Sequence, residues 1–114
     1  MMLMKEGFPG KWRLAEMERW YHDVIESDRP GHIAFQKGGA GTMLLGMIDL
    51  TLAWKPVREG KVEFTFQGFV ELDEVSGRGW AKVVWNGLIG HVKFDEGDQT
   101  RFRAQRWRKR QQAR

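Results

Sequence analysis

The sequence contains no cysteine, and this absence excludes several classes of protein. Without thiols the chain forms no disulfide, no cysteine-based metal site and no thiolate nucleophile. It also lacks any apolar run approaching the ~20 residues that span a bilayer. Its first ten residues, MMLMKEGFPG, hold too few apolar side chains for a secretory signal. We therefore predict a soluble, cytoplasmic protein with no membrane segment.

Histidine is scarce as well. His22, His32 and His91 are the only three, and they form neither an H-x-H nor an H-E-x-x-H spacing. Because a zinc site needs three or four converging ligands, we predict no metal site and no cofactor. The sequence shows no nucleophile, base and orienting group at a recognisable spacing, which favours a protein without catalytic activity.

Positive charge is concentrated at one end of the chain. The formal net charge is +4, but residues 101–114 hold seven of the 19 Lys and Arg residues and no acid. The rest of the chain therefore has 12 bases against 15 acids. We expect a mildly acidic body, residues 1–100, with a basic end. The chain is then divided into a single domain over residues 1–107 and a basic, disordered tail over residues 108–114.

Alternation of apolar and polar residues dominates the remaining sequence. Residues 61–73, KVEFTFQGFVELD, place Val62, Phe64 and Phe66 on one face and mostly polar residues on the other, as a half-buried strand does. Residues 48–54 alternate in the same way, and the glycines at 38–41 turn the chain into that strand. Between the two strands, residues 55–60 (KPVREG) supply Pro and Gly for a turn.

A hairpin is predicted over residues 75–94. Asn86 and Gly87 separate two alternating runs, and both residues tolerate the positive φ of a type I′ turn. Ala81, Val83 and Trp85 then share one face of the first arm.

Three glycines in this hairpin also have predicted roles. We expect Gly77 and Gly79 to form its tight entry. Gly90, inside a strand pattern, indicates a bulge, a bend or room for a large neighbour such as Trp80 or Trp85.

Together these patterns predict a mainly β protein. About seven short strands joined by glycine-containing turns, with one short helical segment near residues 19–27, indicate an antiparallel meander barrel. A two-sheet β-sandwich is the alternative.

The start Gly10-Lys11-Trp12, followed by a glycine-punctuated meander and a late basic residue, resembles the calycin group of lipocalin- and avidin-like barrels. In that group the tryptophan packs across the closed end of the barrel against a late arginine. The resemblance assigns these roles to Trp12 and to Arg103 or Arg106.

The chain more closely resembles a family of small bacterial proteins. Their pattern is a G-x-W start, an I-x-F strand, a G-x-x-E-x-D-x-x-S-G-R-G-W-A segment and a late G-D-x-[ST]-x-F-x-A-x-R. Here these segments begin at Gly10, Ile33, Gly68 and Gly97, and they extend over nearly the whole chain. Asp95 stands where the family pattern has a histidine. The resemblance implies a shared fold and brings no activity.

Polar and aromatic residues near the predicted strand ends are candidate ligand-binding residues. A carboxylate pair beside an arginine binds a cation or a polar ligand, or caps and locks neighbouring turns. Asp49 interrupts an apolar strand, and it is either exposed or an inward polar group that needs a partner. The candidates are Asp49, Trp54, Glu71, Asp73, Arg78, Trp80 and Asp98.

The end of the chain supplies a second candidate site. Interleaved arginine and aromatic side chains suit nucleic acid through phosphate contact and base stacking, whereas a solvated tail is the other reading. The candidate contact residues are Arg106, Trp107, Arg108, Lys109 and Arg110.

The predicted function is a non-catalytic binding module that holds a small ligand or a partner at the barrel mouth. The alternative is an interaction adaptor whose basic tail contacts nucleic acid or an acidic protein. A homodimer through an edge strand or through Trp20 and Tyr21 is compatible with either function.

Overall fold

The computed structural model describes residues 9–17, 31–46, 48–70, 72–85 and 87–107 of the chain. These residues form eight strands and no helix. The predicted helical segment near residues 19–27 lies outside the described residues, as do Trp20 and Tyr21. The strands are β1 (Gly10–Met17), β2 (His32–Phe35), β3 (Ala40–Leu45), β4 (Ile48–Arg58), β5 (Lys61–Val70), β6 (Asp73–Val84), β7 (Gly87–Phe94) and β8 (Gln99–Arg106).

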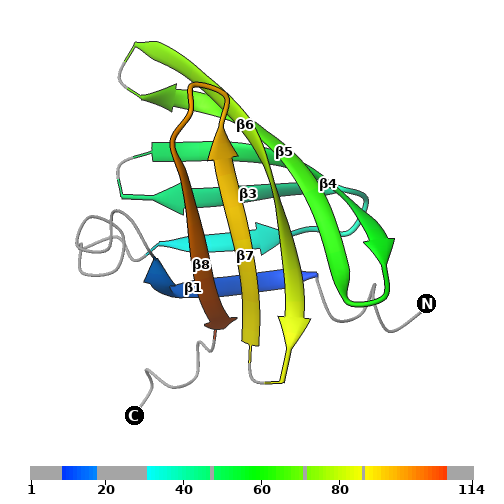
Figure 1. Ribbon diagram of the computed structural model, residues 1–114. Coiled ribbons are helices and arrows are strands. Elements are labelled where there is room, and N and C mark those ends of the chain that lie inside the picture. The colour runs from blue at the N-terminus through cyan, green and yellow to red at the C-terminus, as the bar shows by residue number, and fades with distance from the viewer. Residues whose placement is uncertain (1–8, 18–30, 47, 71, 86, 108–114) are drawn as a thin grey trace.

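The sheet closes on itself (Figure 1). Each strand pairs antiparallel with the next one along the chain, and β8 pairs antiparallel with β1. The predicted antiparallel meander barrel is therefore confirmed, with eight strands instead of seven, and the two-sheet sandwich is wrong. Closure leaves the described sheet without a free edge, so it offers no edge strand for a homodimer.

The eighth strand arises from a turn inside a run that was predicted as one strand. Gly46, with a φ of 63°, lies in the turn between β3 and β4, and glycine adopts this left-handed conformation without a steric penalty. Strand β4 is also longer than predicted. It continues through Pro56 to Arg58, where the register with β5 shifts. Proline is tolerated at such irregularities, so the turn contains only Glu59 and Gly60.

Inward-facing side chains from all eight strands form one core. The predicted inward series Val62, Phe64 and Phe66 is confirmed, with each residue no more than 3% exposed. Phe66 packs edge-to-face against Phe94, with ring centroids 5.0 Å apart, and Phe35 lies 6.2 Å from Phe64. Such aromatic pairs add to the stabilisation that burial of their area provides.

The glycines of β6 lie in the middle of the strand and not at a tight entry to the hairpin, so that prediction was wrong. A Cβ on Gly77 would lie 2.5 Å from Cζ of Phe66, and one on Gly79 would lie 2.6 Å from Cζ of Phe64. Gly90 on β7 likewise makes room for a large neighbour, but the neighbour is Phe102 instead of a tryptophan. Glycine is therefore used where core phenylalanine rings lie against the wall.

The β6–β7 turn is offset by one residue from its prediction. Val84 pairs with Gly87, so Trp85 lies in the turn and Gly87 belongs to β7. Gly87 is not among the glycines with positive φ. Trp85 consequently sits in the turn with 91% of its surface exposed, and it does not share the inner face with Ala81 and Val83.

Candidate functional site

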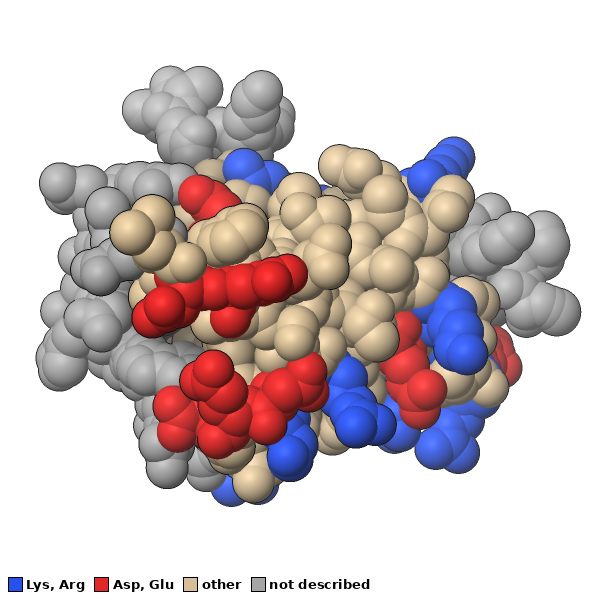
Figure 2. Space-filling model, turned by 90° about the horizontal axis from the view of Figure 1, so that it is seen from above, with Lys and Arg blue, Asp and Glu red and all other residues tan. Residues whose placement is uncertain are grey.

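Most of the acidic residues that the structure describes gather at one end of the barrel, here called the acidic end. This end is formed by the β3–β4, β5–β6 and β7–β8 turns and the residues beside them. Figure 2 looks onto it and shows red carboxylate side chains left of its centre, with blue side chains along the lower and right edges. The acids in these turns and at the adjoining strand ends are Asp49, Asp73, Glu74, Asp95, Glu96 and Asp98.

The structure distributes the predicted ligand-binding residues over three places. Asp49, Asp73 and Asp98 are exposed at the acidic end, and Glu71 lies outside the described residues. Trp54 lies toward the opposite end of β4, about 17 Å along the strand from Asp49. The last two, Arg78 and Trp80, lie on the outer surface of β6. Trp54, Arg78 and Trp80 nevertheless line one depression, whereas the described acids Asp49, Asp73 and Asp98 lie apart from it at the acidic end.

Trp54 closes the end of the barrel opposite the acidic end. Its indole N–H is shared between the carbonyl oxygens of Gln36, at 3.0 Å, and Ala40, at 2.8 Å. The ring packs edge-to-face on Phe35, with centroids 5.6 Å apart. These hydrogen bonds connect β4 to the residues that flank the β2–β3 turn, so Trp54 helps to stabilise this end of the barrel.

Trp12 and Arg106 close the same end from another side. Trp12 is 4% exposed, and the guanidinium carbon of Arg106 lies 3.9 Å from the centroid of its ring. Arg106 also donates a hydrogen bond of 3.0 Å to the carbonyl of Pro9. Partial burial lowers the pKa of Arg106 from its ordinary value through desolvation. The pairing that the calycin resemblance assigns to a late arginine is thus made by Arg106 and not by Arg103.

Trp107 lies against β1 and β2. The Lys11 ammonium is 4.1 Å from the centroid of its ring, and Arg13 is 5.9 Å away. His32 meets the ring edge-on, with centroids 6.3 Å apart. Trp107 is thus packed among cationic groups on the barrel body, while Arg108, Lys109 and Arg110 lie outside the described residues.

The outer surface of β4 to β8 carries a grid of cations, here called the basic wall. The strand register aligns its outward residues in three neighbouring rows that cross all five strands. Within these rows of described residues, eight positions are Lys or Arg and only Glu63 is acidic. The rows are Gln99, Lys93, Arg78, Thr65 and Ala53; Arg101, His91, Trp80, Glu63 and Lys55; and Arg103, Ile89, Lys82, Lys61 and Arg58.

Like charges face each other directly across this wall. Lys61 is opposite Lys82 in the β5–β6 register, and Arg78 is opposite Lys93 in the β6–β7 register. Directly opposed like charges on one face of a sheet are destabilising. Neutralisation of either pair would relieve this repulsion.

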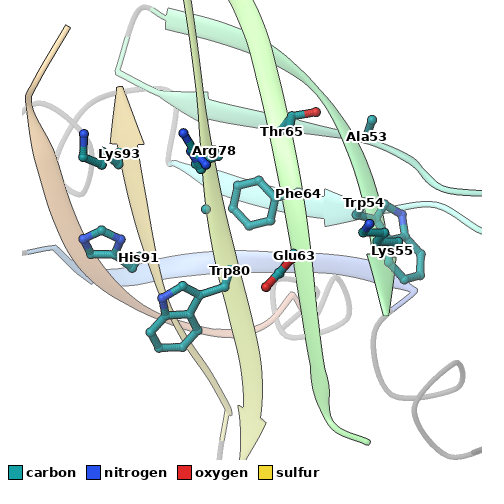
Figure 3. A pocket seen from close by; sticks show the side chains of 11 residues that line it. Ala53, Trp54, Lys55, Glu63, Phe64, Thr65, Arg78, Trp80, His91 and Lys93 are labelled. Atoms are coloured by element: carbon teal, nitrogen blue, oxygen red, sulfur yellow. The ribbon is translucent and has the colours of Figure 1, made fainter. Parts of the chain in front are cut away.

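A depression of about 620 Å³ lies in the middle of the basic wall (Figure 3). Side chains from β4, β5, β6 and β7 line it, and Figure 3 shows the Trp80 indole beside His91 and Glu63. The Lys61 ammonium is 4.9 Å from the centroid of the Trp80 ring, and His91 shares a 2.8 Å hydrogen bond with Gln99. A second depression, of about 420 Å³, borders Trp80 and includes Arg101 and Arg103.

Of the wall residues, sequence reasoning selected only Arg78 and Trp80. The signal that it passed over is the recurrence of Lys and Arg at even spacings, four residues apart in Arg78 and Lys82 and two apart in Arg101 and Arg103. Each pair shares one strand face, but only the register shows that these faces form one surface.

Comparisons with known proteins assign no relative to this chain: no family model, curated protein or solved structure matches it. Among the described residues, no group of three or more His, Asp or Glu side chains is placed to hold a metal ion. The described part of the chain also contains no helix with the length and hydropathy of a membrane span.

Proposed function

We propose that this protein is a non-catalytic binding module that holds a polyanionic partner on its basic wall. The observation that carries the proposal is the set of three cross-strand rows with eight Lys and Arg residues and one acid. Many cations on a continuous surface attract a polyanion and release its counterions, which provides affinity without a deep pocket.

The proposal relocates the predicted binding surface. A ligand at the barrel mouth would need Asp49 together with Trp54 and Trp80, but Asp49 lies at the acidic end, whereas Trp54 and Trp80 line the depression in the wall. The depression at Trp80 is instead bordered by Lys55, Arg78 and Lys93. Phosphate or sulfate groups fit this chemistry because lysine and arginine donate charge-assisted hydrogen bonds to them.

A titration of fluorescently labelled inorganic polyphosphate against the full chain tests this function. We expect binding that weakens steeply as salt rises from about 50 to about 200 mM. Arg78→Glu should weaken it and reduce the slope of log affinity against log salt by about 1. Glu63→Gln should strengthen it, because it removes the acid from the middle of the wall.

Two controls separate the wall from other cations. Lys37→Glu makes a comparable reversal of charge at the exposed β2–β3 turn, away from the three rows, and should change binding less than Arg78→Glu. The triple change Arg108→Gln, Lys109→Gln and Arg110→Gln tests the tail-based adaptor. If the triple variant loses binding and Arg78→Glu keeps it, the tail is the binding element and the proposal for the wall is wrong.

A further inference from the structure

We infer that the polyanion is a single-stranded nucleic acid, which lies along β6 with one base stacked on Trp80. This inference rests on the proposed function, namely that the basic wall binds a polyanion. It adds the class of partner and a specific role for an aromatic residue.

Trp80 faces outward from the barrel wall, unlike Trp12 and Trp54. Trp12 is buried under Arg106, and Trp54 closes one end with its hydrogen-bonded indole. Trp80 belongs instead to the outward-facing series of β6, between Arg78 and Lys82, and it is only partly buried. It borders two depressions on the same surface. An indole that adds nothing to the core, and is reached from two sides, is well placed to stack with a ligand.

The cations around Trp80 have the arrangement that a strand of nucleotides requires. Arg78 and Lys82 lie two residues before and after Trp80 on the same face of β6, each about 7 Å away along the strand. Single-strand binding surfaces combine cations that follow the phosphate backbone with aromatic rings on which bases stack. The Lys61 ammonium now over the Trp80 ring sits on a flexible stem, so it can move to a phosphate when a base takes its place.

A duplex fits this surface less well than a single strand. Base readout in the major groove of a duplex uses a helix or a β-ribbon that enters the groove, and the three rows lie on the barrel wall itself. Paired bases are stacked within the double helix and are not available to Trp80. An acidic peptide would use the cations but would leave the indole without a stacking partner, so the aromatic residue favours unpaired nucleotides.

The test compares three labelled probes by fluorescence anisotropy with the full chain: oligothymidylate of about 12 nucleotides, a duplex of the same length and inorganic polyphosphate. We expect the single strand to bind most tightly. Trp80→Leu should weaken its binding roughly 10-fold or more, which corresponds to the loss of one base–aromatic stack. Trp80→Phe should retain most of the affinity, and polyphosphate should bind Trp80→Leu as it binds the unmodified protein.

Trp85→Leu is the matched control, because Trp85 is 91% exposed in the β6–β7 turn and lies outside the three rows. It should leave binding of the single strand unchanged, and circular dichroism should show that each variant is folded. If all three probes bind alike and Trp80→Leu has no effect, the inference is wrong while the proposed function stands. If none of the probes binds, both are wrong.

Discussion

Along β6, the inward residues at 77, 79 and 81 are Gly, Gly and Ala, whereas the outward residues at 78, 80 and 82 are Arg, Trp and Lys. The inner face lies against phenylalanine rings and has no room for a larger side chain. The outer face is crowded with positive charge and faces Lys61 and Lys93 on the neighbouring strands. Alternate residues of one strand thus serve two purposes, since one face maintains the fold and the other carries the proposed binding surface.

The comparison predicts that neighbouring substitutions on β5 differ strongly in their cost. Phe64→Ala removes a 3% exposed ring from the core and should lower the free energy of unfolding by about 3–5 kcal/mol. Glu63→Ala, one residue earlier on the outer face, should change it by less than about 0.5 kcal/mol. Urea denaturation followed by circular dichroism measures both. An equal decrease in the free energy of unfolding for both variants would show that the inner and outer faces of β5 contribute equally to stability, which would contradict this prediction.

A smaller effect is expected when a single methyl group is added to the inner face of β6. Gly79→Ala places a Cβ against the ring of Phe64 and the carbonyl of His91, so the free energy of unfolding should fall by about 1–3 kcal/mol. Arg78→Ala on the adjacent outward position is the control and should be close to neutral. Thermal denaturation of the two variants measures this difference in stability. A Gly79→Ala protein as stable as the unmodified chain would contradict the tight packing.

The smallest expected change in stability has the opposite sign. Lys82→Glu places a carboxylate directly opposite Lys61, so the free energy of unfolding should rise by about 0.2–1 kcal/mol at low salt. The gain should shrink as salt screens the pair. The same variant should bind polyphosphate more weakly, so stability and binding would move in opposite directions. If both improve, the outer face is not arranged for an anionic partner.

Much of the fold was predictable because its signals are local. The alternation through Val62, Phe64 and Phe66 identifies a strand and its buried face without knowledge of any neighbour. Two errors came from single residues. Gly46 divides one apparent strand into two, and Gly87 starts β7 where a type I′ turn would place it in the turn. Each error depends on a backbone conformation that the residue type permits but does not require.

The candidate site was less predictable because it depends on register. Lys61 and Lys82 are 21 positions apart, and their opposition follows only from the pairing of β5 with β6. The same holds for Arg106 and Trp12, which the calycin resemblance linked but left open between two arginines. Conversely, the alternation pattern does not show which end of the barrel each strand end occupies, so it groups Asp49 with Trp54 although they lie toward opposite ends of β4.

The separation of the acidic end from the basic wall also determines how the protein approaches a charged partner. The molecule extends 39 Å along its longest axis, whereas ionic screening at physiological salt limits electrostatic influence to about 8 Å. The carboxylates in the β5–β6 and β7–β8 turns therefore do little to cancel the field beside the far rows of the wall. A polyanion bound as proposed would meet repulsion on one side of the protein and attraction on another as it approached, so electrostatic steering would orient the encounter before contact.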